Sequence, residues 1–334
     1  EFYIAGSLNP RIKQYIDTNY LNPKNGTLFF ACLDNKFRLK WFKQTGNDSA
    51  VLINRLKYLD HHLYFIIGSN DSITIGTNRY YRKFQNRIQI FGEVNPKNGI
   101  VLWSQSYEND HISGFGHYLT GITKLKNKLY ISGVVGQYKH TILKIGKDTL
   151  IRGSFVVETD TVGNYIKHFH FYTDSLRGGF YSPGISNIES IESDGEYLYI
   201  GGNFSDSLTW NSKRIGTSQI LPGWSPQSEI FIASLTSDLK PRWFYRPKVV
   251  SRNTMITAHG IPKFCHSNGY IYYTTLNGGM KLQFDSTIVN IYETQDLLLL
   301  KMDYMGNVLW ATGGNNNNVN GYSLLYGLSA IEGE

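Results

Sequence analysis

The chain has 334 residues, of which 41% are hydrophobic and 18% charged, so it has enough apolar residues for a core and is unlike a disordered chain. The net charge is +7, but the lysines and arginines are scattered rather than gathered into one stripe, which argues against a nucleic-acid partner. No apolar run reaches the roughly 20 residues that span a bilayer, and two cysteines are too few for a disulfide framework.

The first three predicted strands lie in residues 1–45. Residues 2–6 read Phe-Tyr-Ile-Ala-Gly, a tyrosine between apolar residues followed by small ones. A second apolar segment covers residues 29–33, and a third strand carries Trp41 near its middle. These segments are rich in aromatic residues and too short for helices, so they predict consecutive β-strands.

Residues 51–59 begin a complete unit of four predicted strands. A tyrosine strand follows at residues 63–66, then a second apolar segment at 88–91 and, after Asn98-Gly99, a strand around Trp103. Asn-Gly tolerates the positive φ of a hairpin turn. The unit is therefore interpreted as one sheet with an innermost strand and three outer strands.

The same unit recurs three more times. Its innermost strands are predicted at residues 119–125, 188–193 and 261–265, and its tyrosine strands at 129–133, 198–202 and 271–274. The second segments are predicted at 155–158, 230–233 and 297–300, and the rings of the third strands are His168, Trp243 and Trp310. Four short strands in every 60 to 75 residues, roughly, are typical of propeller blades. The four tryptophans are predicted core residues at equivalent positions.

The two ends of the chain complement each other. The last predicted strand, residues 324–331, has no tyrosine strand after it, and the first tyrosine strand has no innermost strand before it. We therefore predict an all-β fold, a five-bladed β-propeller with four-stranded blades, in which residues 1–334 form a single domain. Residues 324–334 and 1–45 would form the closing blade, which removes two unpaired sheet edges.

Extra segments follow the tyrosine strands at residues 71–81, 138–151, 205–224 and 279–292. Several alternate in polarity around a central turn, as near Trp210, and predict small hairpins at the rim of the propeller. Loops at a rim are where features individual to one protein are expected.

Three segments resemble the SBBP-type propeller repeats of bacterial secreted and surface proteins, especially those of Bacteroidetes: residues 199–205, 229–235 and 303–311. The likeness covers nearly the whole chain, with departures at His168 and Thr275. It implies an extracellular or outer-membrane surface setting and a non-catalytic role, and it transfers no site residue. Because the first residue is Glu1 rather than Met, we interpret the chain as a mature or trimmed product, which no longer carries a targeting segment if it had one.

The sequence contains none of four common catalytic or ligand-binding motifs: it has no paired-histidine zinc motif, phosphate loop, calcium loop or nucleophile elbow. His168 and His170 alternate along one strand and are interpreted as a structural or solvated pair rather than metal ligands. A glycosidase needs carboxylates that converge from different blades, whereas the predicted innermost strands offer only Asp60, Glu189, Glu192 and Glu332. We predict no catalytic residue, metal or cofactor.

The loops that lead into the innermost strands form the predicted binding region. Their polar groups and rings suit peptides or sugars, although Asn, Asp and Gly are also ordinary turn formers. Specificity is expected from residues that break the repeat and surround one funnel mouth: Asp110, His117, Arg177, Tyr181, Arg252 and His259. The rim hairpin around Trp210 is the alternative site.

Three functions remain open. The leading prediction is a non-enzymatic surface propeller that binds or scaffolds a protein, as a subunit of an outer-membrane assembly. The alternative is a lectin-like module that binds glycans, and the third class is a five-bladed glycosidase. A glycan array separates the first two, and the position of funnel carboxylates tests the third.

Deletion of residues 323–334 tests the predicted closure of the ring. Because the deleted strand completes the first blade, the truncated chain is expected to lose cooperative unfolding, measured by circular dichroism during heating. A sharp transition at the original temperature would contradict the closure.

Overall fold

The computed structural model describes residues 1–8, 14–16, 19–22, 26–46, 51–82, 87–109, 118–135, 142–151, 153–172, 186–205, 207–216, 229–252, 263–277, 280–290 and 296–313. All its described elements are β-strands. The prediction of an all-β fold is therefore confirmed.

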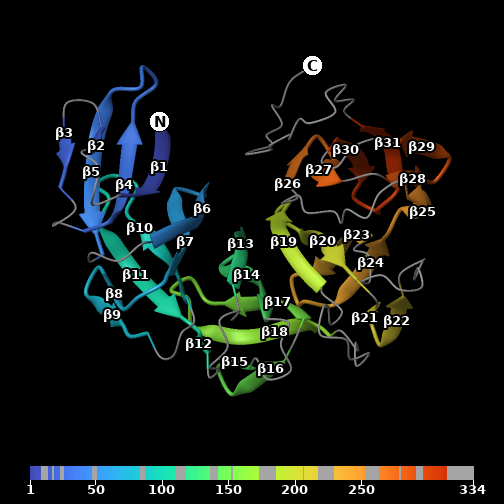
Figure 1. Cartoon of the computed structure of the whole chain (residues 1–334), viewed down its shortest axis with the longest axis horizontal. Helices are drawn as coiled ribbons and strands as arrows, with labels where there is room; N and C mark the ends of the chain where they lie inside the picture. The colour runs from blue at the N-terminus through green and yellow to red at the C-terminus, as the bar shows by residue number, and fades with distance from the viewer. Residues whose placement is uncertain are drawn as a thin grey trace. The chain divides into compact units, whose positions relative to one another are not determined.

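Four sheets share one strand order, in which four strands follow each other as neighbours (Figure 1). Sheet 2 contains β6 (Val51–Leu59), β7 (His62–Ser69), β10 (Ile88–Val94) and β11 (Val101–Ser106). Sheet 3 contains β13 (Tyr118–Leu125), β14 (Lys128–Val135), β17 (Gly153–Thr159) and β18 (Tyr165–Phe171). Sheet 4 contains β19 (Ser186–Ser193), β20 (Tyr197–Phe204), β23 (Glu229–Thr236) and β24 (Pro241–Tyr245). Sheet 5 contains β26 (Lys263–Ser267), β27 (Tyr270–Asn277), β30 (Asp296–Asp303) and β31 (Val308–Gly313).

Sheet 1 has three described strands, β1 (Phe2–Ser7), β4 (Leu28–Leu33) and β5 (Leu39–Thr45), in that order. All five predicted tyrosine strands and the second segment of each unit are confirmed. The predicted fourth strand of sheet 1, residues 324–331, lies outside the described residues. The number of blades and the closure of the ring therefore stay predictions.

The predicted rim hairpins are also confirmed. They are β8 (Ile73–Ile75) with β9 (Asn78–Tyr80), β15 (Ile142–Ile145) with β16 (Asp148–Ile151), β21 (Ser207–Trp210) with β22 (Lys213–Gly216), and β28 (Met280–Phe284) with β29 (Thr287–Asn290). A fifth hairpin, β2 (Gln14–Ile16) with β3 (Asn19–Leu21), was not predicted. Two short strands, β12 (Glu108–Asn109) and β25 (Lys248–Arg252), add to β15 and β28.

The chain divides into two compact units. Unit 1 comprises residues 1–131, 138–152 and 157–167, and unit 2 comprises residues 132–137, 153–156 and 168–334, so the division passes through sheet 3. The core of unit 1 includes Phe30 and Phe65, whose rings lie 5.3 Å apart on neighbouring sheets. The core of unit 2 includes Tyr199 and Phe264. The predicted single domain stays a prediction.

Within each unit, a tryptophan of one sheet packs on a turn of the next. The indoles of Trp41, Trp103 and Trp243 lie against Gly99, Gly163 and Gly306, where an added Cβ would come within 2.6, 2.7 and 2.8 Å of the ring. Each of these glycines has a positive φ, which other residues rarely adopt. The turn thus needs glycine twice, for its conformation and for the space that the indole takes.

The indole also makes a hydrogen bond in this contact. Trp41 Nε1 donates to the carbonyl oxygen of Pro96, and Trp243 Nε1 donates to that of Tyr304, both at 3.0 Å. These carbonyls occupy the same position in their turns. Trp103 Nε1 donates instead to Glu93 Oε2 in its own sheet, at 2.8 Å.

The predicted equivalence of His168 with the tryptophans is wrong. Each tryptophan stands three residues after the residue whose carbonyl accepts the hydrogen bond that closes its turn: Arg38, Ile100, Lys240 and Asn307. In sheet 3 the corresponding residue is Asn164, so the equivalent position is Lys167. Lys167 forms an ion pair with the buried Glu158 at 3.3 Å, which explains a cation at this position.

The prediction of four core tryptophans holds only in part. Trp41, Trp103 and Trp243 are half-buried, whereas Trp310 is 38% exposed. In the described part of unit 2, no turn of a following sheet packs on Trp310. Its own sheet alone leaves the Trp310 ring partly exposed.

Replacement of Trp243 tests the contact between sheets 4 and 5. Trp243→Ala is expected to lower the free energy of unfolding by about 3 kcal/mol, because it leaves a cavity on the Gly306 turn. Trp243→Phe keeps a ring but loses the bond to Tyr304, and about 1 kcal/mol is expected. Urea unfolding measures both, and full stability of the alanine variant would contradict a packing role.

Candidate functional site

Five of the six predicted binding residues lie outside the described residues: Asp110, His117, Arg177, Tyr181 and His259. The sixth, Arg252, was expected in a loop but is the last residue of β25, where it lies opposite Met280 of β28. The difference arises because residues 248–252 pair with the rim hairpin of the next sheet. The proposed convergence on one funnel mouth stays a prediction.

The predicted inward carboxylates do not form a pair from different sheets among the described residues. Asp60, assigned to an innermost strand, lies instead in the exposed β6–β7 turn with a φ of 46° and forms an ion pair with Lys124 at 3.3 Å. Glu189 and Glu192 both belong to β19, and Glu332 lies outside the described residues. The described innermost strands thus carry acids on one sheet only.

Metal-binding geometry is also absent from the described part of the chain, where no group of three or more His, Cys, Asp or Glu side chains is placed to hold an ion. His168 and His170 lie on β18. In the turn before β7, His61 Nδ1 lies 3.2 Å from the hydroxyl of Tyr58. The interpretation of His168 and His170 as a structural or solvated pair stays a prediction.

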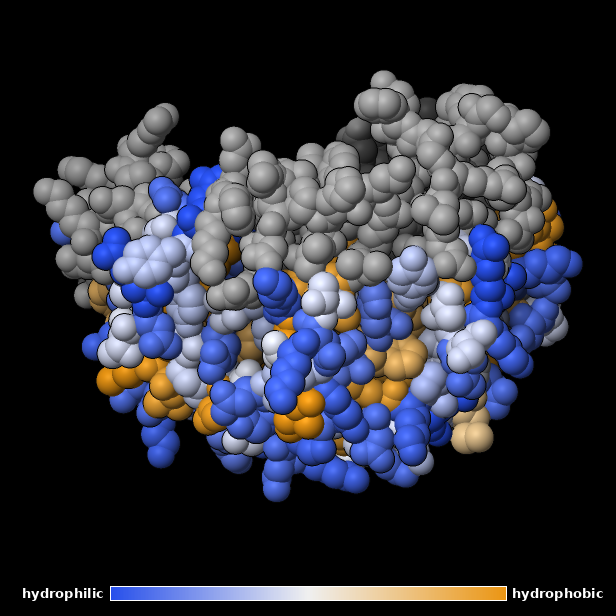
Figure 2. All heavy atoms as spheres, turned by 90° about the horizontal axis from the view of Figure 1, so that it is seen from below, coloured by the Kyte–Doolittle hydropathy of each residue, from blue (hydrophilic) through white to orange (hydrophobic). Residues whose placement is uncertain are grey.

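Exposed aliphatic residues recur on the outermost strands. Leu102 of β11, Ile166 of β18 and Leu309 of β31 are 53, 44 and 49% exposed. Each stands two residues after the residue that closes its turn, so the three positions are equivalent. In Figure 2, apolar side chains form separate orange groups on a mostly hydrophilic face. Sequence reasoning missed these residues, although each directly precedes the tryptophan position of its strand and could have been found by that spacing.

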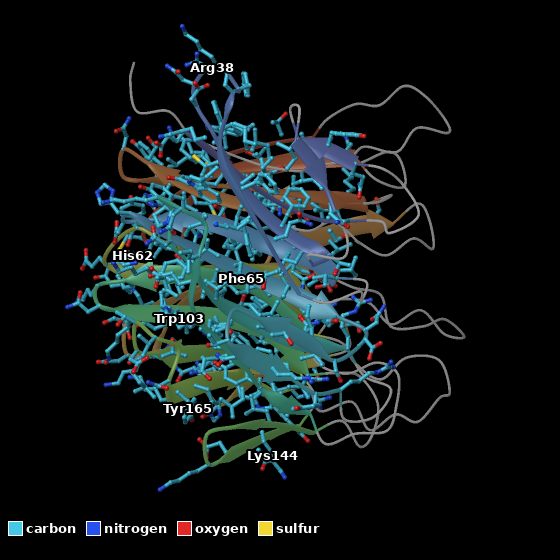
Figure 3. All side chains as sticks on the ribbon, turned by 90° about the vertical axis from the view of Figure 1, so that its left-hand side faces the viewer. Arg38, His62, Phe65, Trp103, Lys144 and Tyr165 are labelled. Atoms are coloured by element: carbon cyan, nitrogen blue, oxygen red, sulfur yellow. The ribbon has the colours of Figure 1, made fainter. Side chains whose placement is uncertain are left out.

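Charged groups at the turn end of sheets 2 and 3 are bound within their own sheets. The buried Glu93 contacts His62 Nδ1 at 2.6 Å and accepts the Trp103 bond described above. The buried Glu158 pairs with Lys128 and Lys167. Figure 3 shows His62 and Trp103 at the same end of the strands. Removing one partner would leave a buried charge without compensation, so these groups stabilise the sheets.

The alternative binding site, the rim hairpin around Trp210, stays a prediction, although its indole is not exposed. Trp210 is only 7% exposed. Its ring packs against Phe169, Phe171 and Phe244 at centroid distances of 5.7, 5.3 and 5.4 Å. The rim hairpin therefore fills space between sheets and does not present this ring to a ligand.

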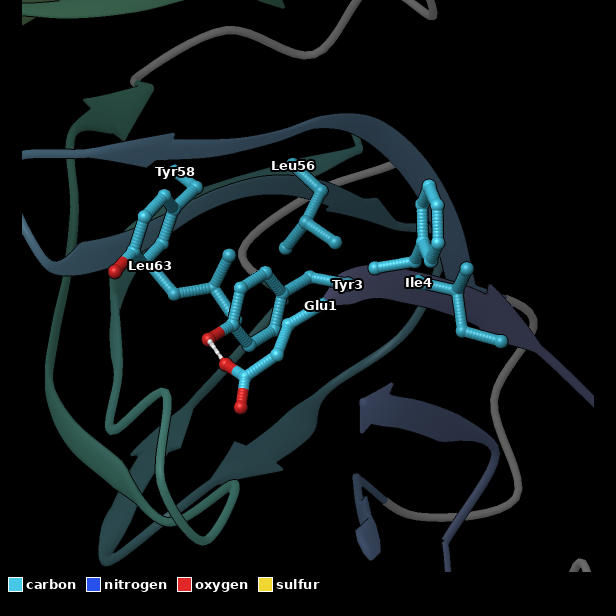
Figure 4. Close-up of a pocket in the computed structure, with 7 residues that line it drawn as sticks. Glu1, Tyr3, Ile4, Leu56, Tyr58 and Leu63 are labelled. Carbon is cyan, nitrogen blue, oxygen red and sulfur yellow. Dashed lines mark hydrogen bonds between the residues drawn. The ribbon is translucent and has the colours of Figure 1, made fainter. Parts of the chain in front are cut away.

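A groove of about 580 Å³ lies beside β1 in unit 1, lined by residues of β1, β6 and β7 (Figure 4). The rings of Tyr3 and Tyr58 stack across it at 5.0 Å, and the Tyr3 hydroxyl donates to Glu1 Oε2 at 2.8 Å. Burial, together with this bond to a carboxylate, raises the pKa of Tyr3. Leu56 and Leu63 make the rest of the lining largely apolar.

No family model matches the chain, and no curated protein matches it. Among solved structures, BamB from Moraxella catarrhalis is similar over 92% of this chain and 76% of its own, with 11% identity and a TM-score of 0.39. The quinohemoprotein alcohol dehydrogenase from Comamonas testosteroni is similar over 93% of this chain and 63% of its own, with 10% identity and a TM-score of 0.39. A glycoside hydrolase reaches a TM-score of 0.22 at 8% identity, over 84% of this chain and 91% of its own. At these scores the likenesses carry no argument, and the fold rests on the sheets themselves.

The SBBP-type resemblance stays a prediction. In the described residues, no helix is long and apolar enough to cross a membrane.

The double variant His117→Ala/Tyr181→Ala tests the predicted loop site. If these residues contribute to specificity, the variant is expected to bind the native partner about tenfold more weakly or worse, measured by calorimetry with a melting curve as the control for folding. Undiminished binding would exclude the funnel mouth as the site.

Proposed function

We propose that the chain is a five-bladed β-propeller that acts as a non-enzymatic binding or scaffolding module at the bacterial cell surface, with a protein as its partner. Four sheets with one strand order and a fifth with three of the four strands support five blades. The tryptophan contact joins neighbouring sheets in both units, which supports a repeated blade. The surface setting is what the SBBP-type resemblance implies.

Several buried carboxylates form ion pairs within the protein, which supports a non-enzymatic role. A general acid or base must come within hydrogen-bonding reach of a substrate. Glu93 and Glu158 are instead buried and paired within their sheets, and the buried Glu229 lies 3.5 Å from Arg246. These acids serve the fold.

The exposed aliphatic residues of the outermost strands carry the proposal of a protein partner. Leu102 and Ile166 lie on the outermost strands of neighbouring sheets in unit 1, and among the described strands nothing pairs with the outer edges of β11 and β18. Exposed apolar side chains beside a free edge suit burial by another protein, whereas a glycan site needs convergent polar groups and rings. A lectin-like site would have to lie elsewhere.

The variant Leu102→Asp/Ile166→Asp tests this surface. The partner is first captured from envelope extracts of the host and identified by mass spectrometry, and its affinity for the purified proteins is then measured by calorimetry. Because two charges would be buried against an apolar contact, binding is expected to weaken at least tenfold.

Ile288→Asp is the matched control, since Ile288 is also exposed but lies on the rim hairpin β28–β29. It is expected to bind like the wild type. Equal affinity of all three proteins would contradict the proposed surface. Specific binding on a glycan array, without any captured protein, would favour the lectin-like alternative instead.

A further inference from the structure

Two lysines lie beside the turn that leads into β11 in unit 1. The stem of Lys43, on β5, packs on this turn, since a Cβ added to Gly99 would come within 2.8 Å of Lys43 Cγ. Lys97 is exposed within the turn itself. Ile100 directly follows Gly99 and is 53% exposed, as Leu102 is. An exposed aliphatic pair therefore has two lysine residues beside it.

An arginine lies on the other side of β11, on the rim hairpin β8–β9. Asn78 Nδ2 donates to the carbonyl oxygen of Ser104 on β11 at 3.2 Å, which holds the hairpin against the strand. The next residue, Arg79, is exposed, and its guanidinium lies 5.1 Å from the ring centroid of Tyr81. The hairpin thus places a third cation beside the outermost strand.

These three cations have no acidic partner. Lys43, Arg79 and Lys97 form no ion pair with a described residue. Four other cations of unit 1 are each paired with a carboxylate: Arg38, Lys40, Lys124 and Lys128. Residues 72–82 and 94–107, which hold the rim hairpin, the turn and the outermost strand of sheet 2, contain no aspartate or glutamate. The positive charge around Leu102 is therefore not neutralised locally.

A β-bulge presents Leu102 at the surface. Glu93 pairs with Trp103 and Val94 with Val101, so Leu102 is the extra residue of its strand. A bulge re-aims a side chain and interrupts regular pairing. The same bulge precedes the tryptophan in three further sheets, where the extra residues are Lys40, Arg242 and Leu309. Because this position holds a cation in two sheets and leucine in two, core packing does not fix its residue.

We propose that the partner bound at Leu102 is an acidic segment of a protein. Its aliphatic side chains contact Ile100 and Leu102, and its carboxylates pair with the three cations around them. This inference rests on the proposed protein-binding function and adds the chemistry of the partner. Unpaired cations around an apolar centre attract a segment of opposite charge and disfavour a basic one. Nucleic acid suits the surface less, because its affinity comes from phosphate contacts, which would leave the aliphatic pair without a partner.

Selection from a phage-displayed peptide library of unbiased composition tests this chemistry, with the purified protein as the target. Enriched peptides are expected to combine aliphatic residues with several aspartates or glutamates. A synthetic copy of the best peptide is compared by calorimetry with a copy in which asparagine and glutamine replace the acids. The acidic copy is expected to bind about tenfold more tightly or better at low salt. Its advantage should shrink from about 0.1 to about 1 M NaCl, because the screening length falls from about 10 to about 3 Å.

The variant Lys43→Glu/Lys97→Glu tests the location. It is expected to bind the acidic peptide about tenfold more weakly or worse, because repulsion replaces attraction at two positions. Lys213→Glu/Lys240→Glu is the matched control, since it changes the net charge equally at exposed lysines of unit 2. The control is expected to bind like the wild type, and melting curves verify that both variants fold.

A selection that yields no acidic peptide, or equal affinity of the two double variants, would overturn the proposal. Duplex DNA that binds the wild type more tightly than the acidic peptide, and is lost in the Lys43→Glu/Lys97→Glu variant, would also overturn it in favour of a nucleic-acid partner. The captured protein distinguishes this inference from the proposed function. If Leu102→Asp/Ile166→Asp weakens its binding and Lys43→Glu/Lys97→Glu does not, the binding surface stands and the acidic partner is refuted; if neither does, both are refuted.

Discussion

The packing of neighbouring sheets depends on one contact, in which the indole of one sheet lies against a turn of the next sheet that contains a residue with positive φ. We call this contact the joint. The turn offers a glycine with positive φ and, in two cases, a carbonyl for the indole nitrogen. Because the tryptophan follows its own turn at a fixed distance, every such sheet carries both halves of the joint. Trp310 of sheet 5 and Phe37 in the turn of sheet 1 are both exposed.

The joint also decides which surfaces are left for function. The rim hairpin β21–β22 contributes to packing between sheets 3 and 4, because the buried Trp210 contacts Phe169 and Phe171 of β18 and Phe244 of β24. Buried acids hold the turn end of the sheets through pairs such as Glu158 with Lys128. Among the described residues, the outermost strands keep exposed aliphatic side chains, such as Leu102 and Ile166. A binding role fits such a scaffold, whose surfaces vary while its contacts repeat.

The strands were predictable because apolar runs with one tyrosine recur at regular intervals. The errors came where neighbours or backbone conformation decide. His168 was chosen as the equivalent of the tryptophans because it carries a ring. Counting three residues from the end of the turn gives Lys167 instead. The run through Asp60 looked like a strand, but positive φ at Asp60 and His61 makes it a turn. Trp310 shares its local pattern with the other tryptophans but is 38% exposed, because no described turn of its unit packs on it. The loop residues chosen for binding, apart from Arg252, lie outside the described residues.

Hydrogen exchange of the β1 amides tests the ring most directly. If β1 is an inner strand of a closed blade, the amides of Tyr3 and Ala5, which point away from β4, should be protected as strongly as those of β7 and β20, since all would exchange only through global unfolding. Mass spectrometry with fragmentation of the exchanged peptides resolves these amides. Rapid exchange of Tyr3 and Ala5, with strong protection retained in β7 and β20, would show an open edge and contradict a closed five-bladed propeller.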